Sequence, residues 1–196
     1  MILRIISIIS TRPGAGQTTV TVNLASGLVR KGFRVLIGVG GYYEKLYKWV
    51  GITNQQEYNL DAKLTDNVDS RIMISREGIG LIDLDCNFPE PIIYSLAMGK
   101  LAYDYLLLYP ATHQDCSLLS LISDQIIVCT DLSHPNELEE LQALEKYLQD
   151  SGGKARKLHL ILPNKINTKE WTHNSQQLSA LADYFGWERI ADPIPT

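Results

Sequence analysis

The chain has 196 residues, of which 45% are hydrophobic and 20% charged, and its formal net charge is −4. This composition predicts one globular domain with a substantial core, and the acidic balance disfavours a protein that coats nucleic acid, which needs a basic face. The three cysteines lack metal-site or disulfide spacing, and no apolar run reaches the ~18 residues that span a bilayer, so we expect a cytoplasmic protein with no membrane segment in this chain.

Apolar, β-rich runs alternate with helical patterns along the chain, which indicates a parallel sheet with crossover helices. The predicted strands are 2–10, 34–39, 80–84, 105–109, 125–129 and 158–162, with a last short one near 189–190. The predicted helices are 18–30, 43–49, 91–99, 118–122, 136–149 and 175–185. The pattern favours a three-layer α/β/α fold with a mostly parallel central sheet of about seven strands, several of them near-continuous Val, Ile and Leu because both faces are covered.

The first predicted strand leads into a glycine-containing loop and then into a helix. Positions 10–19 read S-T-R-P-G-A-G-Q-T-T. Strand, loop and helix in this order allow successive backbone N–H groups and a helix N-terminus to surround a phosphate. The usual pattern, G-x-x-x-x-G-K-[ST], would place glycine at Thr11 and lysine at Gln17. The loop therefore predicts a nucleotide-binding architecture and also questions whether nucleotide is still used.

Read together with the helix, this loop resembles the deviant Walker A box of ParA/MinD-type P-loop ATPases. That box usually reads K-G-G-x-G-K-T-T before an Asn-Leu-Ala helix, and positions 12–25 read R-P-G-A-G-Q-T-T-V-T-V-N-L-A. Three later runs resemble strands of the family in the same order. Residues 103–108 resemble the strand leading to switch II, 123–128 resemble the next strand, and 160–165 resemble the base-recognition strand. The resemblance covers nearly the whole chain and implies a single P-loop NTPase-like domain over residues 1–196, or one excised from a longer protein.

The resemblance also implies which residues would form a nucleotide site. The implied contacts with ATP or ADP are Arg12, Gly14, Gly16, Gln17, Thr18, Thr19 and Asn164. Arg12 stands at the signature lysine that reaches across a dimer in the family, and the Thr18 hydroxyl stands at the magnesium position. Asn164 would contact adenine, although a polar strand end without a ligand is an equal alternative.

The positions that carry chemistry depart from the family pattern in three places. Gln17 replaces the lysine that reaches the outer phosphates, the acidic switch I motif I-D-x-D becomes I-G-V-G at 37–40, and Tyr109 stands where the family has a magnesium-holding Asp. A lysine ammonium ~4 Å from a phosphate oxygen contributes roughly 4 kcal/mol before desolvation, whereas a neutral glutamine donor contributes about 0.5–1.5 kcal/mol. The combined losses predict little or no hydrolysis and no catalytic residue.

The leading interpretation is a ParA/MinD-like scaffold, positioning or regulatory domain, comparable with pseudo-ATPases of the CpaE/TadZ type. It would have no cofactor, or only weakly bound ATP or ADP with Mg. The alternative is a working ATPase switch that uses Arg12 in place of the missing lysine. A P-loop ligase of the wider superfamily is a third interpretation, but it too needs that lysine. We expect unknown protein partners, no nucleic acid, and a monomer or a nucleotide-independent homodimer.

Other features have simpler interpretations. Asp83 and Asp85 suggest a paired-carboxylate site, but a solvated strand end is favoured. The aromatic stretch at 42–49 is typical of a nucleic-acid stacking surface, of a protein contact, or of an amphipathic helix whose rings face the core. The acidic residues at 137–140 open a helix, where they suit the helix dipole and need no further role.

Overall fold

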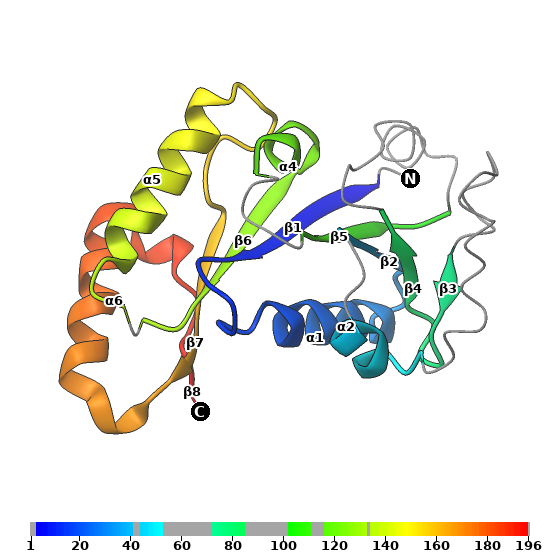
Figure 1. Ribbon diagram of the computed structural model, residues 1–196, viewed down its shortest axis with the longest axis horizontal. Coiled ribbons are helices and arrows are strands. Elements are labelled where there is room, and N and C mark those ends of the chain that lie inside the picture. The colour runs from blue at the N-terminus through cyan, green and yellow to red at the C-terminus, as the bar shows by residue number, and fades with distance from the viewer. Residues whose placement is uncertain are drawn as a thin grey trace. The chain divides into compact units, whose positions relative to one another are not determined.

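A computed structural model gives the fold and describes residues 3–40, 44–52, 72–84, 102–110, 116–132 and 134–195. Helices and strands alternate along most of these residues, except that the described strands at 73–74, 80–83 and 105–109 follow one another without a described helix between them (Figure 1). The predicted helix 91–99 lies outside them, as do Tyr42, Tyr43, Asp85 and Cys86. The chain divides into two compact units, of which unit one is Met1–Ile5 with Thr21–Ala111 and unit two is Ile6–Val20 with Thr112–Thr196.

Eight strands form a mostly parallel sheet, which confirms the predicted α/β fold class with one strand more than expected. They are β1 (Arg4–Ser10), β2 (Val35–Val39), β3 (Met73–Ile74), β4 (Gly80–Asp83), β5 (Tyr105–Tyr109), β6 (Gln125–Thr130), β7 (Leu160–Ile166) and β8 (Ile194–Pro195). Unit one contains the order β3-β4-β2-β5, in which β3 is antiparallel to β4. Unit two contains most of β1 in the parallel order β1-β6-β7-β8.

The described helices follow the predicted pattern closely. They are α1 (Gln17–Arg30), α2 (Glu44–Trp49), α4 (Cys116–Ile122), α5 (Glu137–Asp150) and α6 (Trp171–Phe185), with short 3₁₀ turns η5 (Thr168–Glu170) and η6 (Trp187–Arg189). α1 ends as its sequence indicates, because Gly32 adopts a left-handed φ of 87° and the Phe33 N–H donates to the Leu28 carbonyl at 3.1 Å. The strand expected near 189–190 is reduced to one parallel bridge between Ile161 and Ile190, since η6 takes up the preceding residues.

Burial explains why the strands read as continuous apolar runs. β2 is buried along its whole length, and β1 is buried from Ile5 onward. Such strands are covered on both faces, so alternation between polar and apolar residues is not needed. Of the described helices, none is long and apolar enough to cross a membrane.

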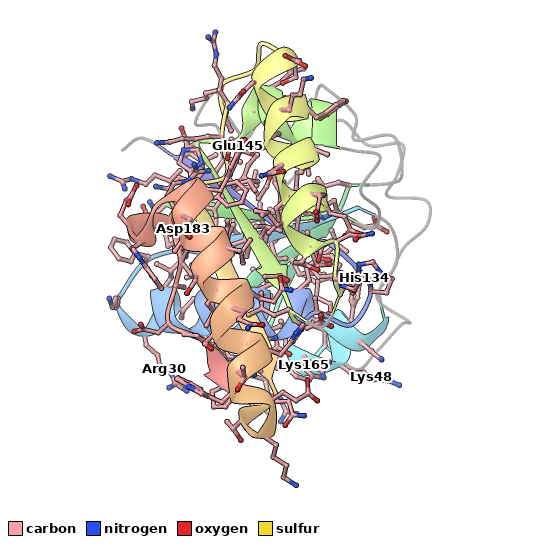
Figure 2. The ribbon with its side chains drawn as sticks, turned by 90° about the vertical axis from the view of Figure 1, so that its left-hand side faces the viewer. Arg30, Lys48, His134, Glu145, Lys165 and Asp183 are labelled. Carbon is pink, nitrogen blue, oxygen red and sulfur yellow. The ribbon has the colours of Figure 1, made fainter. Side chains whose placement is uncertain are left out.

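In unit two, α5 and α6 run side by side (Figure 2). A buried ion pair between Glu145 of α5 and Arg189 of η6 fastens the C-terminal part of the chain to them. The Glu145 carboxylate also accepts the Leu158 N–H at 3.0 Å, ahead of β7. Glu145 Oε2 therefore accepts from both Arg189 Nη2 and the Leu158 N–H, while Oε1 accepts from Arg189 Nη1 at 3.2 Å, so both oxygens of the carboxylate are hydrogen-bonded.

In unit one, Asp104 joins the start of β5 to the residue before β2. Its carboxylate accepts the Arg34 backbone N–H at 2.7 Å and lies 3.3 Å from the Arg34 guanidinium. These contacts, the backbone hydrogen bond first, hold the pKa of Asp104 below its usual value.

Candidate functional site

Two glycines and a few backbone hydrogen bonds shape the loop between β1 and α1. Gly14 and Gly16 adopt left-handed φ values of 92° and 102°, which glycine reaches without strain. The Ala15 N–H donates to the Arg12 carbonyl at 3.4 Å, and the Thr11 N–H donates to the Cys129 carbonyl of β6 at 3.3 Å. α1 then begins at Gln17, one residue before the predicted start at Thr18, so a helix N-terminus follows the loop directly.

The Gln17 side chain folds back onto the strand that precedes the loop. Its Nε2 donates to the Ile8 carbonyl at 2.9 Å, and its Oε1 accepts from the Ser10 hydroxyl at 3.2 Å. Both ends of the carboxamide are thus bonded to β1. A lysine has donors only, so it could not make the bond from Ser10. Gln17 consequently ties the end of the loop to its beginning.

Arg12, the only basic residue of positions 10–19, is surrounded by carboxylates. Its Nη2 is ion-paired with Glu137 and lies 3.6 Å from Glu140, while its Nε lies 4.0 Å from Asp131. The Nε atom is buried and has no hydrogen-bond partner among the described residues. One positive charge faces three negative ones, so the local charge of this cluster is negative.

Glu137 is the centre of that cluster. Its side chain is 0% exposed and stands at the start of α5. One carboxylate oxygen accepts from the Thr11 hydroxyl at 2.7 Å and from the Thr130 hydroxyl of β6, and the other accepts from Arg12. The prediction that this residue has no role beyond the helix dipole is therefore wrong, because Glu137 also holds the first two residues of the loop.

Asn164 lies at the carboxyl end of β7 and packs directly on the loop. Its side chain is buried, and its Nδ2 donates to the Ala15 carbonyl at 2.9 Å. A Cβ atom on Gly16 would lie only 1.7 Å from that same Nδ2. The residue expected to contact adenine thus lies against the loop, and its amide N–H is bonded to loop backbone.

Thr18 and Thr19 lie in the first turn of α1 and are half-buried. The structure therefore brings all seven predicted contact residues together in unit two. Whether they bind nucleotide or magnesium remains a prediction. Within the described residues, no group of three or more His, Cys, Asp or Glu side chains could hold a metal ion.

The two remaining positions of the family pattern lie in unit one. Gly38 is inside β2, where an added Cβ would lie 2.7 Å from Leu84 Cδ1 and 3.2 Å from Leu108 Cδ2. The Gly40 N–H donates to the Tyr109 carbonyl at 2.9 Å, and the Tyr109 side chain is buried at the end of β5. Leucine side chains thus fill the space into which a carboxylate at position 38 would project.

The other residues that the sequence analysis considered differ in how far they are buried. In α2, Tyr47 is buried and Trp49 is 55% exposed, so of these two described rings the core-facing interpretation holds for Tyr47. Asp83 ends β4 and is half-buried. Burial raises the pKa of the Cys129 thiol to about 12, which makes it an inert core residue.

Comparison with known proteins gives matches among solved structures only. Neither the models of protein families nor the curated proteins searched contain a match to this sequence. Solved structures do match, among them a cobyrinic acid a,c-diamide synthase from Mycobacterium smegmatis with bound ADP and magnesium, at 20% identity and a TM-score of 0.72 over 99% of this chain and 87% of that one.

Two further matches are a cell division protein complex and a plasmid partition protein. The MinC:MinD cell division complex of Aquifex aeolicus matches at 17% identity with a TM-score of 0.74, over 98% of this chain and 82% of that one. A plasmid partition protein from Borrelia burgdorferi matches at 17% identity with a TM-score of 0.71, over 100% and 90% of the two chains. Likeness at this level of identity shows that the chain shares the P-loop NTPase α/β fold of these proteins, and it leaves the activity to be argued from the site.

Proposed function

We propose that the chain is a ParA/MinD-like scaffold or positioning domain with little or no ATP hydrolysis. One observation carries the proposal: the loop's only cation, Arg12, is already paired with the buried carboxylate of Glu137. The carboxamide that replaces the loop lysine is bonded to β1 as well. The side chains that would bind phosphate are therefore committed to the protein itself.

A magnitude supports this interpretation. Moving Arg12 to a phosphate would leave the fully buried Glu137 carboxylate without its guanidinium, which costs about 3–5 kcal/mol. A guanidinium ~4 Å from a phosphate oxygen gains about 4 kcal/mol at an effective dielectric of ~20. The free energy lost at Glu137 is about equal to the free energy gained at the phosphate. Arg12 is therefore a poor substitute for a lysine that has no such partner to leave.

The structural matches favour a protein partner, since they include the MinC:MinD complex and a plasmid partition protein. We further propose a cytoplasmic location, no nucleic-acid ligand, and a monomer or a homodimer that forms without nucleotide. A dimer that appears in light scattering only when ATP is added would contradict the last point.

The second candidate is a working nucleotide switch, and one set of observations favours it. The loop glycines keep the left-handed conformation of a phosphate loop, Thr18 retains the magnesium-binding hydroxyl, and similar structures hold ADP or ATP. A ligase resembling the diamide synthase would need nucleotide in the same way.

Calorimetric titration of the whole chain with ATP and ADP, with and without magnesium, separates the candidates. The scaffold predicts dissociation constants of about 1 mM or weaker and no turnover above background. Micromolar binding that Arg12→Ala abolishes would establish the switch instead. Arg30→Ala, at the far end of α1, is a matched control for loss of a surface arginine.

A further inference from the structure

The contacts of Glu137 have a consequence for the loop, and it rests on the proposed function. The two hydroxyls and the guanidinium that surround this carboxylate form a donor set suited to any oxyanion. Two of the three donors, Thr11 and Arg12, belong to the phosphate loop. The Glu137 carboxylate thus accepts from two loop side chains, Thr11 and Arg12, that could otherwise donate to a phosphate bound at the loop.

We infer that Glu137 acts as a built-in competing anion that closes the phosphate loop, and that removing its charge opens the loop to nucleoside di- and triphosphates. Because Glu137 is covalently part of the fold, it meets Arg12 at a high effective concentration, which a dissolved phosphate must overcome. Its position as the first residue of α5 also places the carboxylate at the favourable end of the helix dipole.

The surroundings of Arg12 agree with this inference. Its Nε is buried without a hydrogen-bond partner among the described residues, so the cluster leaves one guanidinium donor unused. The neighbouring loop residues Pro13 and Gly14 are exposed, so a ligand can reach the loop from solvent. Glu140 and Asp131 add negative charge near Arg12 and strengthen the exclusion of phosphate.

Glu137→Gln tests the inference because it keeps the size of the side chain and removes its charge. Wild type and variant are titrated with ATP, ADP, AMP and inorganic pyrophosphate. We expect affinity for ATP, ADP and pyrophosphate to rise about tenfold or more, as removal of one competing charge at contact distance predicts, and AMP to change less. Glu139→Gln, an exposed acid in the same turn, should leave binding unchanged.

A second substitution separates this mechanism from simple loosening of the fold. Adding Arg12→Gln to Glu137→Gln should abolish the gain, because Arg12 is the group that is released. If Glu137→Gln does not fold, the double variant Asp131→Asn with Glu140→Gln, which changes only partly exposed side chains, should give a smaller gain in the same direction.

The outcomes separate the two proposals. Micromolar ATP binding by the wild-type chain would overturn the proposed function. Weak wild-type binding with no gain in Glu137→Gln, or a gain that survives Arg12→Gln, would overturn the competing-anion inference alone. If Glu137→Gln does not fold, no gain in the Asp131→Asn, Glu140→Gln variant would overturn it as well.

Discussion

Gly38 allows a direct test of how tightly leucine side chains pack around this part of β2. An added Cβ there would lie 2.7 Å from Leu84 Cδ1 and 3.2 Å from Leu108 Cδ2, and both leucines are completely buried. A single methyl group must therefore displace leucine side chains in a close-packed core. We expect Gly38→Ala to lower the free energy of unfolding by about 1–3 kcal/mol.

Gly38→Asp introduces a carboxylate into the same leucine-lined space. Burying an unpaired ion costs several kcal/mol more, which is a large share of the 5–15 kcal/mol that typically stabilises a domain. Burial should raise the pKa of the introduced carboxyl group. The loss of stability caused by burying the charge is therefore absent below the pKa of the unfolded state, about 3.9, where the carboxyl group is protonated in both states. This loss grows as the pH rises above that value.

The assay is urea unfolding followed by circular dichroism, with wild type, Gly38→Ala and Gly38→Asp compared at pH 7 and pH 5. At pH 7 we expect Gly38→Asp to be unfolded, or less stable than Gly38→Ala by at least about 3 kcal/mol. The deficit should be smaller at pH 5. Equal midpoints for the two variants at pH 7 would refute the reasoning, since the carboxylate would then have found solvent or a partner.

Two further predictions use the titration behaviour of single groups. Asp104 has a pKa lowered chiefly by the Arg34 backbone N–H, so it contributes stability above its unfolded pKa and loses that contribution as the pH falls through the lower folded value. The melting temperature of Asp104→Asn should lie below that of wild type at pH 7 and approach it near pH 3; a difference independent of pH would contradict this. Burial raises the pKa of Cys129 to about 12, so its thiol should not react with iodoacetamide at pH 8 in the native protein. In urea the same thiol should be alkylated, and peptide mapping by mass spectrometry measures both outcomes. Rapid native labelling of Cys129 would show that this part of β6 is not packed as described.

The fold could be predicted because its signals are local. The run from β1 through the glycine loop to α1 carries apolar residues, turn residues and a helix stop within thirty-two positions, and each element was found close to its place. β3 was missed because an antiparallel strand of two residues has no periodicity to read. β8 was missed for the same reason, since it consists of Ile194 and Pro195 only.

The chemistry of the candidate site was only partly predictable, because its decisive contacts are distant in sequence. Glu137 is more than a hundred residues away in sequence from Thr11 and Arg12, and the sequence contains no spacing pattern that predicts their contact. Asn164 was selected by resemblance, but its bond to Ala15 depends on where β7 lies within unit two. The resemblance identified the positions that differ from the family pattern, but it could not show that Glu137 pairs with Arg12 or that Gln17 bonds to β1.

The contact between Asn164 and Gly16 bears on how glycine motifs are interpreted in other chains. With 1.7 Å between the amide nitrogen and the place of a Cβ, no larger residue fits at position 16 unless Asn164 moves, whether or not a nucleotide is present. Stable packing alone is then sufficient reason to retain this glycine, independently of any selection for catalysis. A loop glycine can accordingly be required by packing, so its presence does not by itself establish ATPase activity in a chain of this fold.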